Sequence, residues 1–406
     1  MSGALSGFKV VDITRGLCGP YCSMQLGDAG AEIIKVEPLQ GDSARLMGPP
    51  FIGDESAVYL ALNRNKKSVV LDIYKKEGGD ILIKLIKNAD VFIEDLGPGQ
   101  PEKLDIGYDQ LKPINPKLIY CAISAFGEKG PMANQPGSEL VVQAMADYTN
   151  SLGAIGAPPV RLGTDVANTN TAVFAFQAIV AALFHRERTG QGQRVSTSML
   201  GSLMHMRGVL WGAQSDPVDS WGDGHHQDNY IMPPEYTYKT KDGHVFLSFG
   251  QHDSSDPDAY QKLLAELGLT EMLEKDPRFK VARQVLGTVS RYAWEVKGIW
   301  EEKFKNMLTQ EVINLFEKYG GLAMPVSNYE MVASHPQVQL LQMIREMDHP
   351  KLGKIKQTGI PWRLYGSPAE FQSPPPALGE HTQEVLSKLE LSEEDIQHLR
   401  EIKVTL

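Results

Sequence analysis

The residues best placed for chemistry lie in and just before the stretch 158–200, PPVRLGTDVANTNTAVFAFQAIVAALFHRERTGQGQRVSTSML. This stretch opens with a short polar segment that contains Asp165 and ends at Asn168, and Glu139 precedes it in the chain. A carboxyl group with a pKa of ~4 is ionised at neutral pH and can attack a carbonyl carbon, whereas the Asn168 amide has no ionisable oxygen. Asp165, three residues before Asn168, is therefore a candidate nucleophile here.

An apolar run behind the polar segment predicts the element that positions it. Residues 172–184 contain no Gly or Pro and exceed the length of a typical strand, so we expect a buried helix. His185, Arg186 and Arg188 follow in the expected last turn, where cations are favourable. Gly190 stands where a left-handed C-cap is expected. The chain then turns into RVSTSML, which begins as a strand.

The first 200 residues alternate between strand-like and helix-like segments. Strands are expected at 8–13, 32–36, 68–73, 90–93 and 118–122. This rhythm predicts an α/β fold with a Rossmann-like, doubly wound large domain. No GxGxxG follows the first strand, so a dinucleotide fingerprint is absent. The loop 14–20 nevertheless follows the carboxyl end of the first strand, where sheets of this kind bind ligands.

A change of composition predicts the domain organisation. Residues 211–235 are rich in Gly, Pro, Asp and His and show no periodicity, which is typical of a linker or a long loop. We therefore expect 1–210 to form the first part of a large α/β domain and 211–235 to form a linker. A smaller α+β domain is expected at 236–325, and 326–406 is expected to return to the large domain.

The composition also limits the possible binding partners and the cellular location of the protein. The net charge of −10 argues against nucleic acid or an anionic membrane surface, because either would repel the chain. Three cysteines, no secretory leader and no apolar span of about 18 residues predict a cytoplasmic protein. No metal is expected, because the cluster around His225 and His226 lies in one loop without ligand spacing.

Several motifs resemble those of the family III CoA-transferases, the formyl-CoA/carnitine transferase type. That family has Pro-Pro, then nine residues ending in the nucleophilic Asp, then a helix, then Glu-Arg-Thr-Gly-x-Gly-Gln. This chain has PP at 158–159 and ERTGQGQ at 187–193, with Asn168 in the place of the Asp. Further fragments in family order include GAEIIKVEP at 30–38, NRNKKS at 63–68 and LGEHT at 378–382.

The resemblance implies an interlocked-ring dimer and a reaction that moves CoA from an acyl-CoA to a free carboxylic acid. It implies CoA contacts, carried over by position, at Arg15, Gly16, Leu17, Cys18, Leu71, Asp95, Leu96, Lys103 and Leu104. Lys103 keeps the positive charge of a family Arg, whereas Asp95 replaces a neutral Asn with an anion and is expected to weaken phosphate binding. The basic run 64–67 is either a phosphate contact or a solvated turn.

Asn168 decides the expected role. In the family an Asp carboxylate attacks the thioester and then carries CoA, and losing such a group typically costs ~10³–10⁶ in rate. We therefore expect a non-catalytic subunit paired with a homologous Asp-bearing subunit. The succinyl-CoA:(R)-benzylsuccinate CoA-transferase of anaerobic toluene degradation looks like such a pair, with a small carboxylic acid as acceptor. Two alternatives stay open: a self-sufficient transferase using Glu139 or Asp165, and an acyl-CoA racemase of the same fold, although the family's racemases also keep the Asp.

Overall fold

The computed structural model describes residues 3–149, 158–208, 237–249, 256–286, 293 and 295–406. The chain divides into two compact units, which are described separately. The first comprises Met1–Ala146, Leu162–Arg207 and Pro336–Leu406, and the second comprises Asp147–Arg161 and Gly208–His335. The predicted linker 211–235 lies outside the described residues, so the domain boundaries predicted around it stay predictions.

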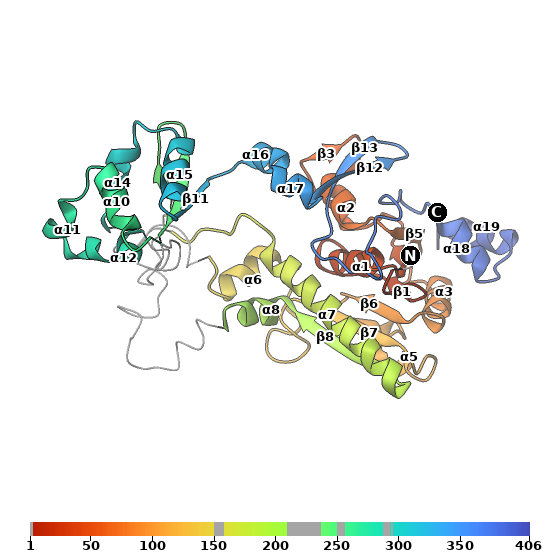
Figure 1. Cartoon of the computed structure of the whole chain (residues 1–406). Helices are drawn as coiled ribbons and strands as arrows, with labels where there is room; N and C mark the ends of the chain where they lie inside the picture. Colours follow the sequence, from red (N-terminus) through yellow and green to blue (C-terminus); the bar gives the residue numbers. More distant parts are fainter. Residues whose placement is uncertain (1–2, 150–157, 209–236, 250–255, 287–292, 294) are drawn as a thin grey trace. The chain divides into compact units, whose positions relative to one another are not determined.

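The first unit is built on a six-stranded parallel sheet (Figure 1). In spatial order its strands are β5 (Lys66–Val70), β2 (Glu32–Glu37), β1 (Lys9–Asp12), β6 (Val91–Glu94), β7 (Ile119–Ser124) and β8 (Gln193–Ser198). Chain order reverses between β1 and β6, which pair Val10 with Val91 and Asp12 with Ile93. The predicted α/β, Rossmann-like fold is thereby confirmed. A reversal of this kind leaves a crevice at the carboxyl ends of the two strands.

Side chains that alternate along the strands supply two separate cores, one on each face of the sheet. Val10, Val91 and Ile119 pack with α1 (Cys18–Asp28) and α7 (Val166–Thr189). Val11 and Phe92, one position further along, pack on the other face with α3 (Lys76–Lys87), α18 (Thr382–Lys388) and α19 (Glu393–Glu401). Helices cover both faces, and therefore the central strands β1, β6 and β7 read as apolar runs in the sequence.

Helix α7 differs from its prediction at the N-terminus. It begins at Val166, six residues before the apolar run, so Asn168 lies in its first turn and not on an extended approach. Its C-terminus is as predicted, with Gly190 in the left-handed conformation at φ 73°. By length and composition α7 is able to cross a membrane, a test that core helices of soluble proteins also pass. Here it packs against α1, β8 and α8 (Met199–Met206).

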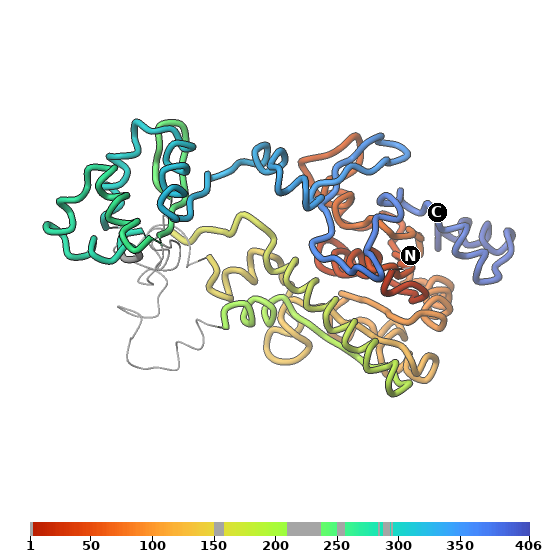
Figure 2. Tube along the Cα trace, viewed as in Figure 1, coloured from red at the N-terminus to blue at the C-terminus, as the bar shows by residue number. Residues whose placement is uncertain are grey.

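The C-terminal segment lies on the first unit beside residues from the N-terminal third of the chain (Figure 2). The basic run 64–67 fastens it there. Arg64 makes a two-pronged ion pair with Asp28 and donates to Gln357 Oε1, and Lys67 pairs with Glu384 on α18 at 2.9 Å. The expectation of a solvated turn was wrong for Arg64 and Lys66, which are buried, and the phosphate contact stays a prediction. The partners of residues 64–67 lie far away in sequence, so the structural role of this run could not be predicted from its local sequence.

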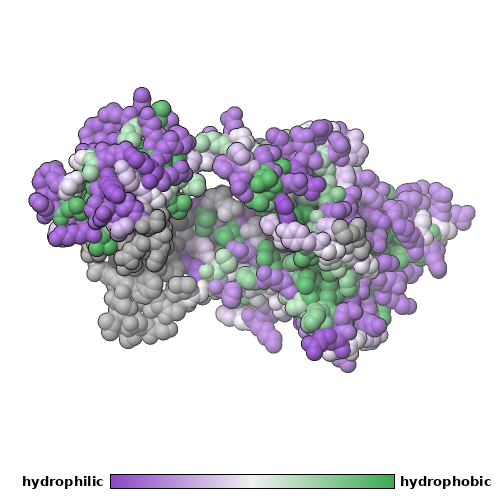
Figure 3. Space-filling view, in the orientation of Figure 1, coloured by the Kyte–Doolittle hydropathy of each residue, from purple (hydrophilic) through white to green (hydrophobic). Residues whose placement is uncertain are grey.

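Short elements complete the first unit. They are η1 (Ser43–Leu46), β3 (Phe51–Ile52), β4 (Glu55–Ser56), α2 (Ala57–Leu62), α4 (Gln100–Lys103), α5 (Tyr108–Leu111), α6 (Glu139–Met145), α17 (Pro336–Leu340), β12 (Ile344–His349) and β13 (Gly353–Thr358). Hydrophobic residues reach the surface in several places (Figure 3). The exposed ones include Leu140, Val141 and Met145 on α6 and Met206 on α8. Helices α6 and α8 contact each other, so these side chains occupy neighbouring elements.

The second unit has its own core. A three-stranded antiparallel sheet joins β9 (Thr237–Lys239), β10 (His244–Ser248) and β11 (Leu322–Pro325). Its helices are α10 (Ala259–Glu266), α11 (Met272–Lys275), η2 (Pro277–Lys280), α12 (Ala282–Leu286), α14 (Lys297–Phe304), α15 (Thr309–Lys318) and α16 (Tyr329–Ser334). Trp300, Phe304 and Phe316 are fully buried between sheet and helices.

Candidate functional site

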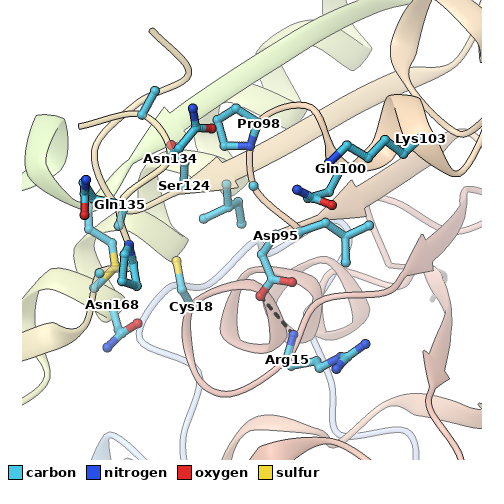
Figure 4. Close-up of a pocket in the computed structure, with 18 residues that line it drawn as sticks. Arg15, Cys18, Asp95, Pro98, Gln100, Lys103, Ser124, Asn134, Gln135 and Asn168 are labelled. Atoms are coloured by element: carbon cyan, nitrogen blue, oxygen red, sulfur yellow. Dashed lines mark hydrogen bonds between the residues drawn. The ribbon is translucent and has the colours of Figure 1, made fainter. Parts of the chain in front are cut away.

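A cleft of about 680 Å³ lies at the carboxyl ends of the parallel strands, at the point where their order reverses (Figure 4). The loops after β1 and β6 and the end of β7 line it, together with the loop residues 133–137. Asn168 reaches it from the first turn of α7, and Met199 from the start of α8. Elements distant in sequence thus meet where an open α/β sheet binds ligands.

Most of the predicted site residues meet in this cleft. Its lining includes Arg15, Cys18, Asp95, Leu96, Lys103 and Asn168. Leu71 lies instead in a small second cleft with Pro38 and Tyr74, and Arg15 lines both clefts. Gly16, Leu17 and Leu104 line neither, and Leu104 packs against the hydrophobic core. The CoA contacts expected at these three positions stay predictions.

Charged side chains fix the backbone of the loop after β1. Lys35 Nζ donates to the Thr14 carbonyl at 2.9 Å, the Arg15 amide donates to Asp95 Oδ2 at 3.0 Å, and the Gly16 amide donates to Asp42 Oδ1 at 2.7 Å. Gly16 has φ 76°, a left-handed conformation that favours glycine. These hydrogen bonds fix the backbone of residues 14–16. The Arg15 side chain, which lines the cleft, therefore extends from a fixed position.

Asp95 is a protonatable acid. Loss of solvation, aided by the Asp12 and Asp42 carboxylates and opposed by the Arg15 amide and Lys35, raises its pKa from 3.8 to about 7. Glu94, the preceding residue, also has its pKa raised to about 7, first by burial and then by Asp95. Asp95 is therefore about half neutral at pH 7, whereas the sequence predicted a fixed anion at this position.

Asn168 is tied to Glu139. The Asn168 side-chain nitrogen and backbone nitrogen each donate to Glu139 Oε2 at 2.8 Å. Glu139 Oε1 accepts from the Ala167 amide and from Gln143 Nε2, also at 2.8 Å. The first pair orients the amide, because only the nitrogen of an Asn side chain can donate to a carboxylate. An acid from α6 thus satisfies amides at the start of α7, which explains why the helix begins before its apolar run.

Neither alternative nucleophile lines the cleft. Both oxygens of Glu139 accept hydrogen bonds, and the carboxylate is oriented toward α7. Asp165 is the exposed N-cap residue of α7. Asn168 is thus the side chain that stands where the resemblance places the nucleophile.

The Cys18 thiol, which also lines the cleft, is uncharged. Burial raises the pKa of the Cys18 thiol well above its ordinary value, and Asp95 raises it further, so the thiol stays protonated. In the part of the chain that the structure describes, no group of three His, Cys, Asp or Glu side chains is arranged to hold a metal. His225 and His226 lie outside that part.

The sequence reasoning did not assign four polar lining residues, Gln100, Ser124, Asn134 and Gln135 (Figure 4). Ser124 closes β7, and the two amides lie in the loop between β7 and α6. These residues follow the carboxyl ends of the neighbouring strands β6 and β7. They could have been predicted by treating every loop at that edge of the sheet as part of the site.

Comparisons with known proteins agree with this architecture. The family model for CoA-transferase family III matches residues 5–382 of this chain. The human succinyl-CoA:glutarate CoA-transferase is 34% identical over 390 residues, covering 95% of this chain and 86% of that protein. The succinate–glutarate CoA-transferase of Agrobacterium fabrum is 30% identical over 404 residues and covers 96% of both chains. A CAIB/BAIF family protein from Brucella suis has a solved structure with a TM-score of 0.81 and 29% identity, covering 96% of this chain and 100% of that one.

Proposed function

This chain belongs to CoA-transferase family III, and we propose that it is the non-catalytic chain of a heteromeric CoA-transferase. Its partner is a homologous chain that carries the nucleophilic Asp. The family reaction moves CoA between an acyl-CoA and a carboxylic acid, as the names of the relatives state. The proposal concerns how this chain takes part in that reaction.

Asn168 is the observation that carries the proposal. A carboxylate oxygen attacks the thioester carbonyl, the C–S bond breaks, and the CoA thiolate leaves with the electron pair. That thiolate then attacks the resulting mixed anhydride at the enzyme carboxyl, which gives an enzyme thioester and releases the donor acid. The nitrogen lone pair of an Asn side chain is delocalised into its carbonyl, so Asn168 cannot form the anhydride. Its amide also donates to Glu139.

The cleft retains features that suit a CoA ligand. Arg15 and Lys103 bring two cations to its lining. Arg15 also lines the smaller cleft around Leu71. We therefore propose that the chain binds an acyl-CoA without reacting with it.

The acid substrates are proposed from the relatives. Their names pair succinyl-CoA with glutarate, D-citramalate or mesaconate, each a dicarboxylic acid. We infer succinyl-CoA as donor and a dicarboxylic acid as acceptor for the complete enzyme. Benzylsuccinate is a dicarboxylic acid and remains a candidate within that class.

Exposed apolar side chains near the site support a partner chain. Leu140 is 50% exposed, Val141 48% and Met206 53%, on the contacting helices α6 and α8. Exposed apolar patches often mark protein interfaces. Glu139 and Asn168 belong to α6 and α7, so a chain that covers this surface lies close to the candidate site.

The test is a CoA-exchange assay on the full-length chain, with succinyl-CoA and either glutarate or benzylsuccinate. Alone, the chain is expected to give no exchange. Co-purified with a homologous chain that has Asp at the matching position, it is expected to give exchange, which Asp→Asn in the partner abolishes. Exchange by this chain alone contradicts the proposal.

A further inference from the structure

The cleft contains one carboxyl group, that of Asp95, which forms no ion pair with any residue that the structure describes. Of the 18 residues that line the cleft, Asp95 is the only acid. Among the described residues, no Lys, Arg or His nitrogen forms an ion pair within 4.0 Å of its carboxylate. Its hydrogen-bond donor is the Arg15 amide, a neutral group, at 3.0 Å. Asp95 thus lies beside a ligand space with its charge unmatched.

The groups around Asp95 do not supply the missing charge. Under the loop after β1, Lys35 pairs with Asp42 at 2.6 Å. Lys66 lies 3.6 Å from Asp12, and burial lowers the pKa of Lys66 to about 7, so its charge also falls between pH 6 and pH 8. Glu94 adds a further carboxyl at the end of β6, and the Cys18 thiol is neutral. Arg15 and Lys103 line the cleft, where they are available to an anionic ligand.

We propose that this cleft binds a CoA ligand together with one proton, which the Asp95 carboxyl takes up from solvent. The inference rests on the proposed function, because it assumes that CoA occupies this cleft. CoA phosphates are anionic, and a carboxylate in the same cleft repels them. Protonated Asp95 is neutral, still accepts from the Arg15 amide through one oxygen, and gains an O–H donor.

The size of the effect follows from the fraction of neutral Asp95. Its pKa of about 7 leaves the carboxyl mostly protonated at pH 6 and only about one-tenth protonated at pH 8. A ligand that selects the protonated form has its apparent Kd divided by that fraction. The Kd for CoA is therefore about tenfold weaker at pH 8 than at pH 6. Binding at pH 8 takes up about 0.9 proton, because that share of the free protein is ionised.

The test is calorimetric titration of the full-length chain with CoA at pH 6 and pH 8, in buffers of different ionisation enthalpy. Asp95→Asn is expected to bind at both pH values about as tightly as the unchanged chain binds at pH 6, without proton uptake. Glu94→Gln is the matched control. Its carboxyl also has a pKa of about 7 but lines a separate small cleft, so the tenfold difference is expected to remain.

Titration with dephospho-CoA distinguishes a proton taken up by the protein from a proton taken up by the ligand. The phosphate of CoA that dephospho-CoA lacks titrates near pH 6, so dephospho-CoA is expected to keep the dependence on Asp95. A Kd that does not change with pH overturns the proposal, as does a pH dependence that persists in Asp95→Asn. Failure of CoA to bind at either pH also overturns it. A failure to bind would also contradict the proposed binding of acyl-CoA, whereas the other results leave the test of the proposed function, CoA exchange by the chain alone, unaffected.

Discussion

Replacing Asn168 by Asp restores the missing nucleophile and is the most informative perturbation of the site. The introduced carboxyl would occupy the position of an amide nitrogen that lies 2.8 Å from Glu139 Oε2. Removing a nucleophile from a catalytic unit costs ~10³ or more in rate. We therefore expect Asn168→Asp to form a covalent CoA adduct at least about 10³-fold faster than the unchanged chain.

Glu139 determines how that variant depends on pH. Two unit charges 2.8 Å apart repel by about 6 kcal/mol at an effective dielectric constant of 20, before relaxation. The pair therefore retains one proton near neutrality. Three N–H donors favour the ionised form of Glu139, from Ala167, Gln143 and the residue-168 backbone, so the introduced carboxyl takes the proton. Its pKa is raised, and adduct formation is expected to increase from pH 6 to pH 8.

The assay is intact-mass spectrometry after mixing with succinyl-CoA, followed by hydroxylamine, which cleaves thioesters and anhydrides. Asn168→Ala is the control, because it removes the amide without adding a nucleophile. The stability of Asn168→Asp is expected to fall as pH rises, because the folded pair holds a proton that the unfolded chain releases. The reasoning is refuted if a folded Asn168→Asp chain that binds CoA forms no adduct, or if Asn168→Ala forms one.

Three further predictions concern the surroundings of the cleft. Glu139→Gln leaves amides at the start of α7 without a full set of acceptors, so the free energy of unfolding is expected to fall by about 1–3 kcal/mol, measured by denaturant titration; unchanged stability contradicts this role. Lys103→Ala is expected to weaken CoA binding about two- to fivefold at low salt and less at high salt, with Lys103→Arg close to normal; an equal loss in both variants argues against a charge contact. Burial raises the pKa of Glu94 from 4.5 to about 7, so the folded chain binds this proton more tightly than the unfolded chain does, and stability falls as pH rises through that window. Glu94→Gln is expected to remove up to about 3 kcal/mol of the stability loss between pH 5 and pH 8, and an unchanged pH profile of thermal unfolding excludes this cause.

The fold was predictable because its causes are local. The strands β1, β6 and β7 are buried on both faces, so each appears in the sequence as an apolar run with helical segments between. Gly190 was predictable for the same reason, since a left-handed C-cap favours glycine whatever surrounds it.

The features that could not be predicted depend on partners far away in sequence. Helix α7 begins at Val166 in part because Glu139, on another helix, accepts from its first amides. Arg64 reads as a solvated or phosphate-binding cation until the fold places Asp28 beside it. The protonation of Asp95 follows from the burial and the neighbouring carboxylates that the loops after β1, β2 and β6 create together.

The central claim is that this chain cannot itself accept CoA or an acyl group covalently. Intact-mass spectrometry of the purified, unchanged chain after incubation with succinyl-CoA tests it most directly. The account predicts the mass of the unmodified polypeptide, with an adduct only on an added homologous chain that carries the Asp. A CoA or succinyl adduct on this chain alone, mapped to Glu139 or Asp165, would contradict it.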